Sequence, residues 1–173
     1  MEYVGVRVIF KRLQKMLTFC GQYRCQMDAN GRLKLNPQLI DGFMEQNAGK
    51  IVMHCLPEGA VAVYPENTYL EMRKNEQAAA AMAADSVVFR RKMRRFGALS
   101  SSARISEQGR LTVPQGFRDY GLLCPGEEVL VVGVEIGIEL WNVERWNAEL
   151  EKMDEHANAK GASEMAGDLL MKE

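Results

Sequence analysis

The sequence has few of the residue types on which catalysis and metal binding commonly depend. Its 173 residues include only two histidines and four cysteines. The spacing of Cys20, Cys25, Cys55 and Cys124 matches neither paired zinc ligands nor a dense disulfide framework, so we expect reduced, mostly buried thiols. His54 adjoins Cys55, but neighbours on a strand point to opposite faces. We therefore predict no enzyme activity, no metal site and no cofactor.

Long apolar runs and glycine-rich phosphate loops are also missing. The longest apolar stretch runs from Val129 to Trp141 and is interrupted by Glu135 and Glu139. A bilayer requires roughly 20 apolar residues. Near the N-terminus, cations follow the only apolar run where an export signal would have its cleavage site. With 47% apolar and 26% charged residues, the composition is that of a globular protein. We predict a cytoplasmic protein that does not contact a membrane.

The formal net charge of −1 conceals an alternation of basic and acidic segments. Residues 1–34 carry seven basic and two acidic groups, and residues 35–85 carry three basic and seven acidic groups. Residues 86–118 carry eight basic groups and one acidic group, and residues 119–173 carry four and thirteen. Two interpretations remain open. The basic segments gather on one face and create a local positive field, or the charges only solvate the surface.

The sequence contains an internal repeat. The aligned segments are 27–35 on 105–113 and 51–53 on 129–131 at an offset of 78, and 61–64 on 138–141 at an offset of 77. Gly, Arg and Leu are identical in the first pair of segments. Each copy has the pattern of strand, tight turn, strand, short helix, strand, turn, strand and longer helix. The repeat therefore predicts a mainly β protein with flanking helices, of the α+β class.

Local patterns specify turns and inward faces. Asn30-Gly31 predicts a two-residue hairpin turn, because both residues tolerate positive φ. Leu33 and Leu35 alternate with Arg32 and Lys34, which places the leucines inward and the cations outward. In the second copy, the same alternation predicts inward side chains for Ile136, Ile138 and Leu140. Pro57-Glu58-Gly59 predicts a further turn.

Helices are predicted between and after the two copies. One covers residues 66–84, and a second begins with Asp85 as N-cap and ends at Gly97. Its buried stripe is predicted to be Phe89, Met93 and Phe96. Its cations are either a phosphate-facing surface or a complement to the helix dipole, and both interpretations stay open. After Asn142 we expect an acidic amphipathic helix to about Met153, followed by a frayed segment.

The candidate site is the duplicated Gly-Arg sequence at the tip of each turn. The guanidinium groups of Arg32 and Arg110 would face solvent there, and their fixed donors suit phosphate oxygens or the O6 and N7 atoms of guanine. An alternative is that Arg32 only pairs with Asp28 across its own turn, which is worth about 0–1 kcal/mol. That alternative fails in the second copy, where Ser106 replaces the aspartate.

Four stretches carry a resemblance to a known family. They are Phe19-Cys20-Gly21, Asp28-Ala29-Asn30-Gly31-Arg32, Gly109-Arg110-Leu111-Thr112-Val113-Pro114 and Glu139-Leu140-Trp141. Together they resemble the MraZ family of bacterial transcriptional regulators, and the resemblance covers about residues 16 to 155. The Asp-x-x-x-Arg motif, its duplication, the Arg-Leu-x-Val-Pro string and the late Glu-Leu-Trp are specific when taken together.

The resemblance implies two SpoVT-AbrB-like modules whose swapped hairpins interlock into one double-split β-barrel. It further implies a ring-like homo-oligomer that binds repeated promoter elements of double-stranded DNA at the nucleoid, upstream of its own division and cell-wall gene cluster. The motif arginines map onto Arg32 and Arg110. The full set of candidate DNA-binding residues is Arg32, Arg110, Asp28, Lys34, Arg24 and Arg104.

The resemblance also suggests a domain organisation. The segments are a dispensable extension 1–15, a first module 16–70, a helical connector 71–99, a second module 100–153 and an acidic tail 154–173.

One departure from the family motif affects the expected function. Ser106 can close its turn through its hydroxyl but cannot hold Arg110 by charge, so we expect Arg32 to contribute more to DNA binding. The alternative function is a ring-forming protein-binding module, antitoxin-like or an adaptor, with weakened DNA recognition.

Overall fold

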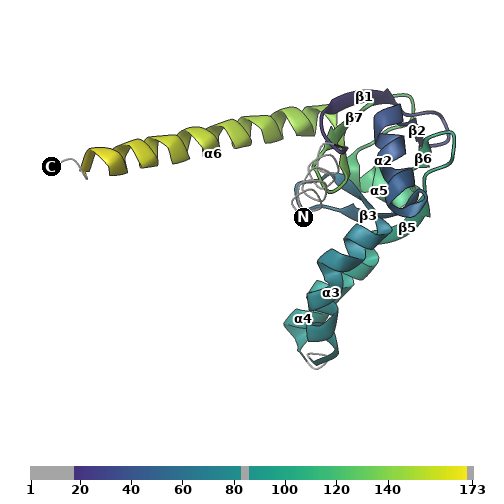
Figure 1. The fold of residues 1–173 in the computed structure, drawn as a ribbon, viewed down its shortest axis with the longest axis horizontal. Helices are drawn as coiled ribbons and strands as arrows, with labels where there is room; N and C mark the ends of the chain where they lie inside the picture. The colour runs from purple at the N-terminus through teal and green to yellow at the C-terminus, as the bar shows by residue number, and fades with distance from the viewer. Residues whose placement is uncertain (1–17, 83–85, 171–173) are drawn as a thin grey trace, which may run out of the picture. The chain divides into compact units, whose positions relative to one another are not determined.

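The computed structural model describes residues 18–82 and 86–170, except for the side chains of 75–82 and 162–170. The chain divides into two compact units, residues 1–142 and 143–173. The first unit contains the repeated strands and the second contains one helix (Figure 1). The predicted extension 1–15 lies outside the described residues.

The observed elements confirm the predicted α+β class and the repeated order. The first copy consists of β1 (Gln22–Gln26), β2 (Arg32–Lys34), α2 (Pro37–Asn47), β3 (Lys50–Cys55), β4 (Val61–Pro65) and α3 (Glu66–Met82). After α4 (Val87–Ala98), the second copy consists of β5 (Ser100–Arg104), β6 (Arg110–Thr112), α5 (Gln115–Gly121), β7 (Glu128–Gly133), β8 (Ile138–Asn142) and α6 (Val143–Leu170). Strands β1, β2 and β3 begin 78 residues before β5, β6 and β7, as the repeat predicts.

The larger sheet has the strand order β1-β7-β8-β4-β3-β5 and is antiparallel throughout. Strand β1 of the first copy pairs with β7 of the second, and β5 of the second copy pairs with β3 of the first. The two copies therefore exchange their first strands. At the centre, β4 pairs with its own repeat equivalent β8. This order reads the same when the copies are interchanged, so the sheet has a pseudo-twofold arrangement.

A separate two-stranded ribbon joins β2 to β6. Leu33 lies opposite Leu111, its own repeat equivalent, and both side chains are fully buried. Beyond each strand, Leu35 N–H donates to the Gly109 carbonyl over 3.0 Å, and Val113 N–H donates to the Gly31 carbonyl over 2.9 Å. The ribbon therefore fastens each strand to the turn of the other copy. Figure 1 shows β2 and β6 side by side.

The hydrophobic core draws on both copies. Buried residues from the ribbon, from inner strands of the larger sheet and from the segment after β5 pack in one cluster that includes Leu33, Leu35, Ile105, Leu111 and Val131. The predicted inward face of residues 33 and 35 is thus confirmed. In the second copy Ile138 and Leu140 are buried, but Ile136 is 45% exposed because it precedes β8 and lies in the turn after β7. The prediction for Ile136 was wrong.

The cysteines only partly match their predicted state. All four are free thiols, but only Cys55 is buried. Cys20 and Cys25 are half-buried and Cys124 is exposed. The expectation of mostly buried thiols was therefore wrong.

The connecting helices differ in detail from the predicted ones. Helix α4 begins after its N-cap Ser86, whose hydroxyl accepts a hydrogen bond from Phe89 N–H, and the predicted cap Asp85 lies outside the described residues. It ends at Ala98, one residue beyond Gly97. Its apolar stripe is not buried, since Met93 is 38% exposed and Phe89 is half-exposed. The turn predicted at 57–59 is observed between β3 and β4.

A small aromatic cluster attaches α3 and α4 to the sheet. Phe96 stacks on His54 of β3 with 5.1 Å between ring centroids, and the Arg73 guanidinium lies 3.6 Å from the centre of the Phe96 ring. Ser100 Oγ lies 2.8 Å from His54 Nδ1 and 2.9 Å from Tyr69 Oη. Burial lowers the pKa of His54. The neutral imidazole is therefore favoured in this cluster.

The second unit is the helix α6, which extends from Val143 to Leu170. It is considerably longer than the predicted helix, because it continues beyond Met153. The expectation of a frayed segment after residue 153 was therefore wrong for residues 154–170.

Strand exchange predicts that the two copies fold only together. A fragment 16–85 would leave β3 and β4 without β5 and β8 and would expose the apolar residues that they cover. We expect separately expressed fragments 16–85 and 86–155 to show no cooperative thermal transition by circular dichroism, whereas a chain of residues 16–155 melts cooperatively. A monomeric fragment with a cooperative transition would contradict the exchanged arrangement.

Candidate nucleic-acid interface

The first motif turn is a three-residue loop closed between Asp28 and Arg32. Asp28 N–H donates to the Arg32 carbonyl over 2.9 Å, and Gly31 N–H donates to the Asp28 carbonyl over 3.0 Å. Gly31 has a φ of 72°, whereas Asn30 is not in the left-handed region. The prediction of a two-residue turn was therefore wrong. The flanking strands pair with β7 and β6 rather than with each other, so the twist of a two-residue hairpin is not required here.

The second turn has the same geometry. Ser106 N–H donates to the Arg110 carbonyl over 3.0 Å, and Gly109 N–H donates to the Ser106 carbonyl over 2.7 Å. Gly109 has a φ of 73°. The Ser106 hydroxyl accepts a hydrogen bond from Arg110 N–H over 3.0 Å, which confirms that serine can close this turn.

Asp28 acts on the backbone rather than on the guanidinium of Arg32. Its Oδ1 accepts hydrogen bonds from the N–H groups of Asn30 and Arg32 at 2.8 and 2.9 Å. Within 18–82 and 86–170, neither motif guanidinium makes a hydrogen bond or an ion pair. The expected charge pairing of Asp28 with Arg32 is thus not found, and it gives no reason for Arg32 to exceed Arg110. Both side chains accept the N–H of the arginine that ends the turn, and Asp28 accepts that of Asn30 as well.

The ribbon brings the two motif arginines together on one exposed face. In the β2–β6 register, Arg32 lies opposite Thr112 and Lys34 lies opposite Arg110. All four side chains are exposed, while Leu33 points inward. Diagonal neighbours across a ribbon are about 7–8 Å apart at their Cα atoms, which applies to Arg32 and Arg110. Lys34 and Arg110 carry like charges directly opposite each other, and such a pair destabilises a ribbon. An anionic ligand would relieve this repulsion, so the face favours one.

Each turn is covered by a helix of the other copy. The guanidinium end of Arg118, from α5, lies against Gly31, where an added Cβ would be 2.7 Å from Arg118 Nε. Ile40, the repeat equivalent of Arg118 on α2, lies against Gly109. Glycine is therefore required at both turns for two reasons, its positive φ and the space taken by the opposing side chain.

Two other predicted site residues, Arg24 and Arg104, belong to strands of the larger sheet. Arg24 on β1 forms an exposed ion pair with Glu128 on β7, with 2.5 Å between Nη1 and Oε2. Arg104 lies at the end of β5, two residues before the second turn, opposite Lys50. The structure thus brings Arg32, Lys34 and Arg110 together, sets Asp28 in the backbone of its turn, and leaves Arg24 paired with an acid.

Sequence reasoning missed two cations near the turns. Arg118 belongs to the second basic segment, but only the contact of α5 with the first turn reveals its position. Lys50 lies in an acidic segment and comes close to Arg104 through the β3–β5 register. The repeat offset could have flagged Arg118 as the counterpart of Ile40, although not the contact itself.

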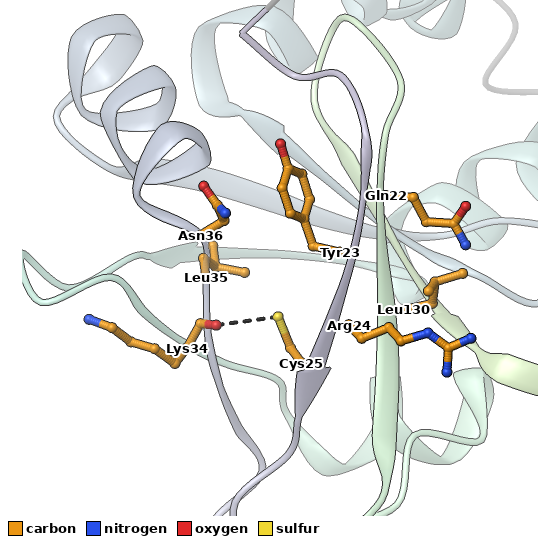
Figure 2. A pocket seen from close by; sticks show the side chains of 8 residues that line it. All are labelled: Gln22, Tyr23, Arg24, Cys25, Lys34, Leu35, Asn36 and Leu130. Carbon is orange, nitrogen blue, oxygen red and sulfur yellow. Dashed lines mark hydrogen bonds between the residues drawn. The ribbon is translucent and has the colours of Figure 1, made fainter.

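A pocket of about 590 Å³ opens between β1 and the segment 34–36 that leads into α2 (Figure 2). Tyr23 and Cys25 point toward that segment, whereas Gln22 and Arg24 point to the other side of β1. Burial raises the pKa of the Cys25 thiol, and its S–H donates to the Lys34 carbonyl over 3.3 Å. The charged groups do not converge in this pocket, so the ribbon face remains the candidate site.

Metal-binding clusters and membrane-spanning helices are both absent from the described residues. Across 18–82 and 86–170, histidine, cysteine and acidic side chains form no group of three or more that could bind a metal ion. No helix in the part of the chain that the structure describes has the length and apolarity needed to cross a membrane.

Comparisons with known proteins find similar sequences over most of this chain. The family described as "MraZ protein, putative antitoxin-like" matches residues 101–169. The transcriptional regulator MraZ of Bifidobacterium longum is 31% identical over 150 residues, which are 87% of this chain and 91% of that protein. The protein of the same name from Halothermothrix orenii is 30% identical over 141 residues, or 79% and 90% of the two chains. That of Corynebacterium kroppenstedtii is 28% identical over 148 residues, or 85% and 97%.

Fold and site define a class of tandem-repeat α+β proteins in which two copies exchange strands and present an arginine turn each. The sequence identity of 30–31% over most of both chains shows which family of this class the chain belongs to. The chain belongs to the MraZ family.

The packing of Ile40 on the second turn can be tested through Gly109. Placing a non-glycine residue at positive φ costs about 1–2 kcal/mol, and overpacking adds about 1–3 kcal/mol. Gly126 has a φ of 85° but nothing within 4 Å of an added Cβ. We expect Gly109→Ala to lower the free energy of unfolding more than Gly126→Ala, by about the overpacking term.

Chemical denaturation measures both variants. An Ile40→Ala background removes the overpacking, so the two glycine substitutions should then cost the same. An equal cost in the wild-type background would contradict the proposed contact.

Proposed function

We propose that this protein is a sequence-specific DNA-binding transcriptional regulator. The observation that carries the proposal is the β2–β6 ribbon, which joins the arginine turns of both copies and exposes Arg32, Lys34 and Arg110 on one face. Relatives that cover most of this chain bear the name transcriptional regulator MraZ. Regulation of this kind requires binding and no catalytic group.

The ribbon suits the major groove of B-DNA. That groove is wide enough for a two-stranded β-ribbon, and its guanine edges offer the O6 and N7 acceptors. Arg32 and Arg110 have no competing partner among the described residues, so their guanidinium groups are available for bidentate bonds to these edges. Lys34 and Thr112 lie beside them and would contact phosphate oxygens. Base contacts would supply specificity, and phosphate contacts would supply affinity and register.

The rigid turns reduce the entropic cost of binding. Each arginine follows a glycine held at positive φ, and its backbone N–H is bonded to the side chain of Asp28 or Ser106. The backbone is therefore already ordered when DNA arrives, and only the arginine side chains lose rotamer freedom. Since in both turns the side chain of the first residue accepts the arginine N–H, we propose that both arginines contribute, including the one in the Ser106 copy.

The finer architecture forms part of the same proposal. The exchanged pairs β1–β7 and β5–β3 support two SpoVT-AbrB-like modules, 16–70 and 100–153, interlocked as one double-split β-barrel around a connector 71–99. Exposed apolar residues on α4, namely Val87, Val88 and Met93, support assembly with copies of the same chain. We propose a ring that binds repeated promoter elements of its own division and cell-wall gene cluster, in the cytoplasm at the nucleoid.

A protein-binding module is the second candidate function. The matching family is described as antitoxin-like, and the same exposed residues of α4 could contact a different protein. Binding to a protein would not require a face with like charges opposite each other, whereas phosphate binding explains it directly. We therefore rank DNA binding first.

Footprinting on the DNA upstream of the chain's own gene tests the proposal. We expect protection of short repeated elements, and we expect Arg32→Ala and Arg110→Ala each to reduce specific affinity by about 1–3 kcal/mol, the value of one bidentate base contact. Their melting temperatures should stay close to that of the wild type, because both side chains are exposed.

Lys74→Gln is a matched control, because it removes one exposed cation from α3, where Lys74 pairs with Glu71 over 3.6 Å. It should leave the footprint unchanged. If both arginine variants bind the upstream DNA like the wild type, the ribbon is not the DNA-binding face, and the protein-binding function becomes the better explanation.

A further inference from the structure

The two motif turns have different neighbours although their backbones match. At the first turn, the side chain of Arg118 lies over Gly31, with its Cδ and Cζ each 3.0 Å from the position of an added Cβ. At the second turn, Ile40 occupies the equivalent place over Gly109. The Nζ atom of Lys34 lies 3.6 Å from an added Cβ at Gly109, and Lys34 donates to the carbonyl of Gln108 in that turn.

Each turn therefore has a cation supplied by the other copy, but from positions that are not repeat equivalents. The first turn combines the acid Asp28 with Arg32 and receives Arg118 from α5. The second combines the acid Glu107 with Arg110 and receives Lys34 from β2. Thr112 and Ile40, the equivalents of Lys34 and Arg118, carry no charge. The two turns thus reach the same balance of one acid and two cations by different routes.

Arg118 is held in place and keeps donors available. Its Nε–H donates to the Val113 carbonyl over 3.1 Å, and Val113 N–H donates in turn to the Gly31 carbonyl. This bond uses one of the five guanidinium N–H donors and leaves the four on Nη1 and Nη2. Within the described residues, no carboxylate forms an ion pair with Arg118. A half-buried arginine so oriented is a preorganised anion site.

We propose that Arg118 contacts a DNA phosphate beside the first turn, as the counterpart of Lys34 at the second. The proposal rests on the DNA-binding function proposed above. A phosphate is the expected ligand rather than a base, because the Nε bond keeps the guanidinium against the turn while Arg32 and Arg110 extend from the ribbon face. Arg118 also offsets the repulsion between the Asp28 carboxylate and an approaching phosphate. The second turn has the uncharged Ser106 at the position equivalent to Asp28, so this repulsion does not arise there.

A structural role for Arg118 is the competing explanation. The bond to the Val113 carbonyl and the packing on Gly31 could by themselves explain why an arginine is found here. The two roles differ in the chemistry that they require. Packing and the Nε bond need the guanidinium, whereas phosphate binding needs a positive charge, which lysine also supplies.

The test compares full-length Arg118→Gln, Arg118→Lys and the control Lys74→Gln with the wild type. Affinity for a duplex from upstream of the chain's own gene, and for a scrambled duplex of equal length, is measured by fluorescence anisotropy over a series of salt concentrations. Removing one phosphate contact lowers the slope of log K against log salt by about 0.9. We therefore expect the ratio of the wild-type to the Arg118→Gln association constant to fall about threefold when the salt concentration rises about fourfold.

Arg118→Lys should keep the wild-type slope even though it loses the bond to Val113, and Lys74→Gln should keep both slope and affinity. Melting temperatures are measured in parallel. The inference is overturned if Arg118→Gln keeps the wild-type slope. It is also overturned if Arg118→Gln and Arg118→Lys lose the same affinity and their melting temperatures fall to match. If either of these results is found while Arg32→Ala still weakens binding in the same assay, the inference on Arg118 fails and the proposed function stands. If the wild type does not distinguish the two duplexes, the proposed function fails instead.

Discussion

The pairing of β2 with β6 is the interaction on which the rest of the structure depends. It places Leu33 against its own repeat equivalent Leu111 in the core, and the same register places the motif arginines on the opposite face. Because side chains alternate along a strand, these two results cannot be separated. A slip of one residue would expose the leucines and bury Arg32 and Arg110. The core therefore specifies the orientation of the candidate site.

Exchange of strands explains how such a short ribbon remains ordered. Two three-residue strands bury too little apolar surface to be stable alone. In this chain each is continued by backbone hydrogen bonds to the turn glycine of the other copy, and each turn is covered by a helix of the other copy. The turns thus obtain their rigidity from the whole first unit, and rigid support lets exposed arginines bind with a smaller loss of entropy.

The sequence allowed the repeat, the order of elements and the outward position of Arg32 to be predicted, because these depend on local periodicity. Its local patterns did not reveal that β1 pairs with β7, since pairing between copies is a matter of tertiary contact, and only the family resemblance implied swapped hairpins. The Asn30-Gly31 signal was misread for the same reason, because the strands beside it do not pair with each other. The stripe on α4 was predicted as buried from its spacing alone, but spacing identifies an apolar face without identifying what covers it.

The unequal neighbours of the two turns show how a duplicated site can diverge in its side chains while its backbone geometry is kept. Serine replaces aspartate in one copy, yet Ser106 Oγ and Asp28 Oδ1 accept the same backbone N–H, so the turn geometry is kept. What changes is charge, and charge acts over several ångströms rather than at one atom. In the second turn the carboxylate comes from Glu107 and the second cation from Lys34, and neither position is the repeat equivalent of Asp28 or Arg118. Geometry therefore constrains the backbone of each copy residue by residue, whereas electrostatics constrains only the balance of charge around each turn.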